Sequence, residues 1–341
     1  MGRFFGFLFF LVIVLGAAAG GAWFYGQHVY TQPGPENAGG APRSVMIESG
    51  SNVPKIADKL KAAGAITDDF PFRMAVRVTD TGPRLKAGEY AIASGASLKD
   101  IVQQLVEGRV VLHAVTAPEG LTSAQIVRIV GEEKVLSGDL PEVAPAEGVL
   151  LPDTYMVQRG ETRAAVLDRM VKAQQNLVAE LWPTRQDGLP FKTQQEAIIL
   201  ASIVEKETGN ASERPEVAAV FVNRLRRGMR LESDPTIIYG ITKGEPLGRT
   251  IRSSELDRDD GYNTYKIDGL PPTPICNPGA DAIRAVLNPP VSKALFFVGD
   301  GKGGHVFAET YSEHQKNVAL YWKIRNANAA AGVNTPAVKP K

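Results

Sequence analysis

Hydrophobic residues form an almost continuous run between two predicted helix ends in one stretch, Thr193–Gly209, with the sequence TQQEAIILASIVEKETG. Thr193 followed three residues later by Glu196 is a capping-box pattern and predicts that a helix begins here. Gly209 predicts a helix end in the left-handed conformation. Apolar residues occupy nearly every position between these ends, so we expect the helix to be buried on most sides. We therefore expect the carboxylate of Glu205, in the last turn, to lie among apolar side chains.

The position of Glu205 favours one protonation state. At about 100° per residue it shares a helix face with Ser202, whereas Glu207 points in roughly the opposite direction. Partial desolvation and the negative end of the helix dipole both favour the protonated form of a carboxyl group there. Such a group is suited to act as a general acid. The pattern leaves a second interpretation open, in which Glu205 is solvated and pairs with Lys206 or Arg214.

The amino terminus carries an uncharged run of 21 residues, Phe4–Phe24, preceded by Arg3. This length suits a helix that crosses the ~30 Å hydrocarbon core of a bilayer. The aromatic residues Trp23–Tyr25 at its end suit the membrane interface. We predict a transmembrane anchor at residues 1–26, with the rest of the chain exported. The alternative is a cleaved signal peptide whose apolar core is Phe4–Leu15.

The middle of the chain contains a short repeat: a glycine, an aliphatic residue six positions later, and another four positions after that. Each copy predicts a strand, a glycine turn and a helix with apolar residues at i and i+4. The copies are too few for a solenoid, and we assign no chemistry to them. They are Gly50/Ile56/Leu60, Gly95/Ile101/Leu105, Gly120/Ile126/Val130 and, more weakly, Gly160/Val166/Met170.

The carboxyl-terminal third begins with another predicted helix, capped by Ser212 and stopped by Gly228. Beyond it helical periodicity fades, and prolines, tyrosines and asparagines become dense. Tyr and Asn side chains suit sugars, which offer hydroxyl edges and apolar ring faces, so we predict a carbohydrate-binding groove. A short helix at Asp281–Leu287, a hairpin at 295–308 and a last helix from Thr310 to about Ala329 follow.

Composition and charge exclude several classes of function. The 341 residues are 44% hydrophobic and 22% charged, as in an ordinary globular protein of two or more domains. A net charge of +1 gives no argument for nucleic acid. The single cysteine, Cys276, excludes an intramolecular disulfide and any site built from several cysteines. The four histidines show no paired spacing, so we expect neither a metal nor a cofactor.

No catalytic triad, zinc motif or nucleotide-binding fingerprint is present in the sequence. What remains is an exported domain with one distinctively placed carboxylate and loops suited to carbohydrate. Ordinary glycosidases use two carboxylates, and Asp234 is the best second candidate to act with Glu205.

At this point several motifs, in order, resemble the endolytic murein transglycosylase (YceG-like) family, and the resemblance covers nearly the whole chain. It extends to the amino-terminal span, a LysM-like middle section and the segment PDTY. The motifs are LASIVEKET at Leu200–Thr208, NRLRRGMRLESDPTIIYG from Asn223, YNTY from Tyr262, GLPP from Gly269, NPG from Asn277, and FFVGDGKGGHVF.

The resemblance implies an α+β protein with an amino-terminal transmembrane helix, a small mixed α/β LysM-like module and a mixed α/β catalytic domain. Its segments are a transmembrane anchor (1–26), a periplasmic linker (27–43), the LysM-like module (44–112), a connecting α/β region (113–190), the catalytic domain (191–329) and a disordered tail (330–341). Whether the module binds glycan or only spaces the active domain from the membrane stays open, with spacing the simpler interpretation.

The resemblance also implies a reaction, in which peptidoglycan strands are cut between N-acetylmuramic acid and N-acetylglucosamine to leave 1,6-anhydro ends. The family's catalytic glutamate falls on Glu205, which acts first as acid and then as base, without a metal or cofactor. Five hypothetical groove residues are Asp234, Tyr239, Asn263, Tyr265 and Asn277.

The implied setting is the inner membrane, with the catalytic domain in the periplasm. There the family is associated with ending nascent glycan strands beside the peptidoglycan synthases. Two rivals remain: a hydrolytic muramidase that uses Glu205 with Asp234, and a scaffold that binds peptidoglycan without cutting it.

Overall fold

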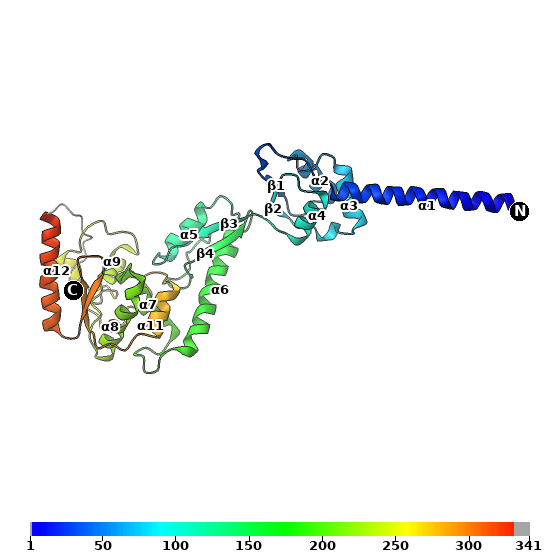
Figure 1. Ribbon diagram of the computed structural model, residues 1–341. Helices are drawn as coiled ribbons and strands as arrows, with labels where there is room; N and C mark the ends of the chain where they lie inside the picture. Colours follow the sequence, from blue (N-terminus) through cyan, green and yellow to red (C-terminus); the bar gives the residue numbers. More distant parts are fainter. Residues whose placement is uncertain (1, 331–341) are drawn as a thin grey trace. The chain divides into compact units, whose positions relative to one another are not determined.

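The computed structural model describes residues 2–330 and contains mainly helices with three two-stranded sheets. The chain divides into two compact units. The first holds residues up to His113 together with 156–161, and the second holds the remainder. Figure 1 labels the elements of both. The mixed α/β class predicted from the sequence is confirmed.

The first unit begins with a long apolar helix, α1 (Gly2–Thr31). By length and composition, residues Phe4–Thr31 could cross a membrane, since an 18-residue window of this segment has a mean hydropathy of 2.3. The helix runs past the predicted anchor boundary at residue 26 and ends just before Gln32-Pro33. Proline disfavours the helical conformation in the residue that precedes it, which explains this end.

The rest of the first unit packs two strands and three helices around one core. Strands β1 (Arg43–Ile47) and β2 (Gly88–Ile92) pair antiparallel. The predicted repeat is confirmed here, since Gly50 and Gly95 make left-handed turns (φ 76° and 73°) before α2 (Val53–Ala62) and α4 (Leu98–Glu107). Helix α3 (Asp69–Val78), which lies between the two copies, was not predicted.

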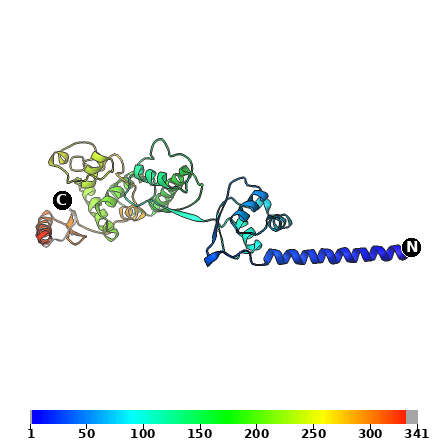
Figure 2. The ribbon, with the colours of Figure 1, turned by 90° about the horizontal axis from the view of Figure 1, so that it is seen from above.

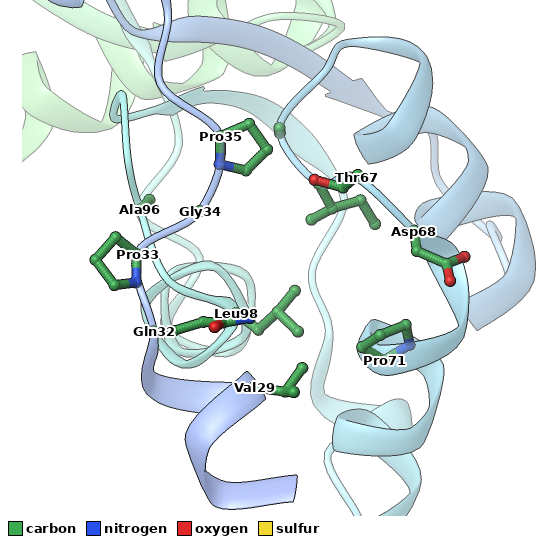
Figure 3. Close-up of a pocket in the computed structure, with 12 residues that line it drawn as sticks. Val29, Gln32, Pro33, Gly34, Pro35, Thr67, Asp68, Pro71, Ala96 and Leu98 are labelled. Atoms are coloured by element: carbon green, nitrogen blue, oxygen red, sulfur yellow. The ribbon is translucent and has the colours of Figure 1, made fainter. Parts of the chain in front are cut away.

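The segment after α1, predicted to be a flexible linker, is partly fixed to this core. The backbone N–H of Gly34 donates to the carbonyl of Gly95 (3.1 Å), and the N–H of Gly95 donates to the carbonyl of Pro35 (3.2 Å). A side chain on Gly34 would lie 2.2 Å from the carbonyl oxygen of Ala96, so only glycine fits there. Figure 3 shows the small cavity, about 140 Å³, that this packing leaves beside the end of α1. Two backbone hydrogen bonds hold this part of the chain in place.

The other two repeat copies are also strand–turn–helix units. They comprise β3 (Leu112–Thr116) with α5 (Ser123–Glu132), and β4 (Thr154–Gln158) with the long helix α6 (Arg163–Leu181). Strands β3 and β4 pair with each other, and the boundary between the two units falls within them. The predicted cap of α6 is confirmed, since the Thr162 side chain accepts from Ala165.

The core of the second unit is built on α7 (Gln194–Glu207), α8 (Arg214–Arg226) and α11 (Ala280–Leu287). The capping box of Thr193 and Glu196 is formed as predicted. A hairpin of β5 (Phe296–Gly299) and β6 (His305–Ala308) packs against the last helix, α12 (Tyr311–Ala330), and Figure 2 also shows them side by side. The remaining predicted tail residues, 331–341, lie outside the described part of the chain. Short 3-10 turns occupy Ala38–Gly40, Gly82–Arg84, Trp182–Thr184 and Ala211–Glu213.

Three local predictions in this unit were wrong. Helix α7 ends at Glu207 with Thr208 extended, and Gly209 is not left-handed. Ser212 does not cap α8, because a 3-10 turn leads directly into that helix. Two short helices, α9 (Asp234–Thr242) and α10 (Ser253–Leu256), occupy part of the region predicted to be loop. Their apolar positions are too few to show a helical period. Arg224, in the last turn of α8, is buried and donates to the carbonyls of Leu231 and Leu295.

Candidate active site

One face of α7 carries Ser202 and Glu205, and the proline-rich loop of residues 269–279 runs along it. The Ser202 hydroxyl accepts from the backbone N–H of Ile275 (3.0 Å). Three residues further along the helix, Glu205 Oε2 accepts from the backbone N–H of Gly279 (3.0 Å). Cys276, between these contacts, is fully buried and packs against the Ser202 carbonyl. The face predicted from helical periodicity is thus the face that the loop covers.

Glu205 is buried but not isolated. Its side chain is 4% exposed, and Oε1 accepts a hydrogen bond from Nη2 of Arg214 (2.7 Å). Arg214 is the first residue of α8 and is itself buried. The open alternative from the sequence was therefore half right, because Glu205 does pair with Arg214 but is not solvated.

A second carboxylate, Glu119, joins the same arginine. Its Oε2 accepts from Nη2 of Arg214 (2.8 Å), and its side chain is 40% exposed. Glu119 precedes Gly120 in the turn of the third repeat copy. Carboxylate oxygens of Glu119 and Glu205 thus lie within hydrogen-bonding distance of one nitrogen atom. A turn to which we assigned no chemistry thus contacts the arginine that binds Glu205.

Backbone and side-chain bonds place the Glu119 turn against the loop and α7. Gly120 donates its N–H to the carbonyl of Asn277 (3.1 Å), and Asn277 donates in return to the carbonyl of Leu121 (2.9 Å). The ammonium group of Lys206, next to Glu205, donates to the carbonyl of Gly120 (3.1 Å). Three segments distant in sequence therefore meet at Glu205.

A side chain at Gly279 would displace the Glu119 carboxylate. Gly279 has a φ of −72°, which suits any residue, so the backbone would not be strained. A Cβ atom there would lie 1.8 Å from Oε1 of Glu119 and 2.3 Å from its carboxyl carbon. The absence of a side chain at Gly279 lets Glu119 approach the backbone that binds Glu205.

Opposing effects set the pKa of Glu205. Burial is the largest and raises the pKa above its ordinary value, and the negative charge of Glu119 raises it further. The hydrogen bond from Gly279 and the positive charges of Arg214 and Lys206 lower it, and the net shift is upward. The upward shift confirms the direction expected from the sequence. Burial favours the protonated form of Glu205, and the hydrogen-bond donors stabilise its carboxylate form, so each protonation state is stabilised by part of the site.

Two of the hypothetical groove residues are fully buried and hold loops. The Asn277 amide accepts from the N–H of Leu150 (3.0 Å) and donates to the carbonyl of Leu121 (3.1 Å). The Asn263 amide donates to the carbonyls of Leu256 (2.9 Å) and Arg258 (2.6 Å). Neither side chain presents surface to a ligand in this conformation.

Asp234 and Tyr265 form a separate pair. The Tyr265 hydroxyl donates to Asp234 Oδ1 (2.7 Å) at the start of α9. The neighbouring Ser233 hydroxyl donates to Glu207 (2.5 Å), the carboxylate on the other side of α7. Burial, with the charge of Asp234, raises the pKa of Tyr265. Asp234 is thus bonded to Tyr265, and its neighbour Ser233 is bonded to Glu207.

Tyr239 lies in an aromatic pair at the far end of α9. Its ring packs on that of Tyr262 with centroids 5.1 Å apart, and the Lys243 ammonium group lies 4.3 Å from the Tyr262 centroid. Tyr239 is buried, whereas Tyr262 and Lys243 are partly exposed. The accessible members of this cluster are Tyr262 and Lys243, and neither was among the groove residues named from the sequence.

Glu119 and Gly279, which contact Arg214 and Glu205, were missed as candidate site residues, and Arg214 was considered only as a surface partner. A weak signal existed for Glu119, since it immediately precedes the glycine of the third repeat copy. Among residues 2–330, no group of three or more His, Cys, Asp or Glu side chains is arranged to hold a metal ion.

The chain has relatives among known proteins. Residues 45–320 match the model of the YceG-like family. The chain is 31% identical to an endolytic murein transglycosylase of Streptococcus pneumoniae, over 91% of this chain and 64% of that protein. It is 27% identical to an endolytic murein transglycosylase of Bacillus subtilis, over 90% of this chain and 92% of that protein. The chain therefore belongs to the YceG-like family, which confirms the resemblance found in its motifs.

The share of the related protein that this chain covers differs from one relative to another. The chain spans less than two thirds of the length of the Streptococcus pneumoniae relatives. The crystal structure of a YceG-like protein from Listeria monocytogenes is 28% identical and aligns with 80% of this chain and 98% of that one, with a TM-score of 0.49.

Proposed function

We propose that this protein is an endolytic lytic transglycosylase of peptidoglycan, with Glu205 as its catalytic acid and base. One observation carries the proposal. A buried carboxyl group with a raised pKa is held by hydrogen-bond donors to both of its oxygens. Family membership supplies the substrate, since the named relatives are endolytic murein transglycosylases.

The first step is a proton transfer. Protonated Glu205 gives its proton to the glycosidic oxygen between N-acetylmuramic acid and N-acetylglucosamine. The bond from that oxygen to C1 of the muramic residue breaks, the electron pair stays on the oxygen, and positive charge develops at C1. Glu205 is now a carboxylate, which the N–H of Gly279 and the guanidinium group of Arg214 stabilise.

The second step restores the enzyme. The Glu205 carboxylate takes the proton of the muramic C6 hydroxyl, whose oxygen bonds to C1 and closes the 1,6-anhydro ring. The proton that Glu205 lost in the first step is thereby replaced, and no water is consumed. One residue performs both steps, which requires that both of its protonation states be accessible.

Burial of Glu205 supports an intramolecular attack over hydrolysis. The side chain is 4% exposed, and a dry site disfavours a competing water molecule. The C6 hydroxyl is already part of the substrate and has a high effective concentration at C1.

The hydrolytic alternative needs a second carboxylate that activates water or attacks C1. Asp234, the candidate from the sequence, is bonded to Tyr265, whereas Glu119 shares a nitrogen of Arg214 with Glu205. A muramidase on this site would therefore use Glu119, and a non-catalytic scaffold would need neither carboxylate.

Product analysis separates these possibilities. Purified full-length protein is incubated with uncrosslinked glycan strands, and the fragments are analysed by mass spectrometry. Lytic cleavage gives anhydro ends that are lighter than reducing ends by one water, and internal cuts give a range of fragment lengths. Reducing ends would identify a muramidase, and intact strands would identify a scaffold.

We also propose that α1 anchors the protein in the inner membrane as a single pass, with the catalytic unit in the periplasm. There it would end nascent strands beside peptidoglycan synthases. Its length and apolar composition support this location. Immunoblots of membrane fractions should show the full-length chain; a shortened soluble product would identify α1 as a cleaved signal peptide.

A further inference from the structure

Helix α3 has two apolar faces, and the protein covers only one of them. Phe72 and Val76 point into the core of the first unit and are fully buried or nearly so. Phe70, Met74 and Val78, spaced by four residues, form a second stripe and are 60%, 40% and 66% exposed. An apolar stripe of this kind on a water-facing surface requires an explanation.

The exposed stripe forms one wall of an apolar groove of about 640 Å³. The other wall is the last part of α1, from Ala22 to Tyr30, including Trp23 and Tyr25. Trp23 and Tyr25 are 64% and 70% exposed. The groove therefore joins the apolar surface of α1 to that of α3 without interruption.

The groove lies at the position along α1 where the helix is expected to leave the hydrocarbon core of the membrane. At about 1.5 Å per residue, the uncharged run Phe4–Phe24 spans the ~30 Å hydrocarbon core. The groove starts at Ala22, where that run ends, and continues over the next two turns of the helix. The first of those turns, about 5.4 Å long, falls in the interfacial layer, which adds about 5–8 Å on each side of the core. The stripe on α3 thus lies beside the part of α1 that meets the lipid headgroups.

The attachment of α1 keeps the stripe at this level. Tyr30 packs against the core of the first unit, and Gly34 and Pro35 are bonded to Gly95. Figure 3 shows the end of α1, the following chain and Pro71 of α3 around one small cavity. Because the connection is short and bonded, α3 cannot swing away from the surface through which α1 passes.

Charges of both signs border the stripe. Arg73 pairs with Asp69 (3.0 Å), and Asp68 lines the groove. Arg73 and Arg77 are exposed and, at helical spacing, follow one border of the line Phe70–Met74–Val78. Long basic side chains beside an apolar stripe can reach phosphate groups while their stems lie on the acyl boundary.

We propose that α3 docks on the membrane that α1 crosses, with phospholipids filling the groove between the two helices. The inference rests on the proposal that α1 is a membrane anchor. The docked helix would hold the first unit flat against the bilayer surface and so limit how far from the membrane the catalytic unit can reach.

Spin labels on the full-length protein test this docking. Met74→Cys places a label in the stripe, and the only native cysteine, Cys276, is buried and unreactive by position. Ala91→Cys is the matched control, because Ala91 is exposed on β2, which lies on the side of the unit away from the start of α1 (Figure 1). Both variants are reconstituted in vesicles of phosphatidylcholine and phosphatidylglycerol. Label accessibility is compared for oxygen, which partitions into lipid, and for a water-soluble nickel chelate.

We expect the ratio of oxygen to nickel accessibility to be severalfold higher at position 74 than at 91. Labels at Phe70→Cys and Val78→Cys should give the same result. Equal ratios in protein that floats with the vesicles would overturn the docking while leaving the anchor intact. Spin–spin broadening that grows with the protein-to-lipid ratio would overturn it by identifying a second copy in the groove. Protein that does not float would overturn the anchor and the docking together.

Discussion

Nη2 of Arg214 donates a hydrogen bond to Oε1 of Glu205 across 2.7 Å, and neither side chain is more than 8% exposed. The attraction between two buried charges is largely offset by the cost of removing them from water. The Arg214–Glu205 pair is therefore expected to contribute little net stability to the fold. Its stronger consequence is chemical, since Arg214 keeps the carboxylate form of Glu205 accessible while burial favours the acid.

The first prediction concerns the proton that Glu205 transfers. Glu205→Gln keeps the shape of the side chain but removes its acid and base functions, so we expect the rate of strand cleavage to fall by about 10²–10⁴-fold or more. Glu207→Gln is the matched control, because the amide oxygen can still accept from Ser233. The measurement is release of anhydro ends from glycan strands. Normal turnover in Glu205→Gln would contradict the assignment.

Removal of Arg214 should shift the pH profile upward. The positive charge of Arg214 lowers the pKa of Glu205, so Arg214→Met raises that pKa further. Cleavage begins with protonated Glu205, and its loss at alkaline pH should therefore occur at higher pH in this variant. The measurement is kcat/KM against pH. The fold should also lose about 3–5 kcal/mol of stability at neutral pH, and less at low pH, where Glu205 is neutral. An unchanged alkaline limb would contradict the role given to Arg214.

Glu119→Gln should have the opposite effect on the same profile. The negative charge of Glu119 raises the pKa of Glu205, and the amide that replaces it can still accept from Arg214. Loss of that charge lowers the pKa of Glu205, so activity should disappear at lower pH than in the wild type. If the enzyme were a muramidase that uses Glu119 as nucleophile or base, activity would be lost at every pH instead.

Gly279→Ala tests the fit between the loop and Glu119. The added methyl group would overlap the Glu119 carboxylate, which must move and loosen the Arg214 contact. We expect a substantial loss of activity. Gly209→Ala is the control, because a methyl group there would meet no atom within 4 Å and Gly209 does not need the left-handed conformation. Equal activities of these two variants would show that Glu119 has room to adjust.

Asn263→Ala separates a binding role from a structural one. The buried amide satisfies two carbonyls and the N–H of Tyr265, so its removal should cost about 2–3 kcal/mol of stability. Thermal unfolding should report this loss, with KM for glycan strands nearly unchanged in the folded protein at low temperature. A raised KM with unchanged Tm would support the groove role inferred from the family.

Much of the local structure could be predicted because it depends on neighbours in sequence. The capping box at Thr193 and the apolar run after it predicted α7 and the burial of Glu205. The glycine spacing predicted four strand–turn–helix units, with Gly120 and Gly160 left-handed like the first two. Helix α3 was missed because its apolar residues lie on two faces, which obscures a single amphipathic period.

The sequence by itself determined which helix ends in the key carboxylate, the direction in which burial shifts its pKa, and the family to which the chain belongs. Only the tertiary structure decided what surrounds that carboxylate. Arg214 meets Glu119 across 95 residues of sequence, and Gly279 meets Glu205 across 74. Contacts of this range arise from how the third repeat turn, α8 and the proline-rich loop pack against one another, and local periodicity carries no information about that packing.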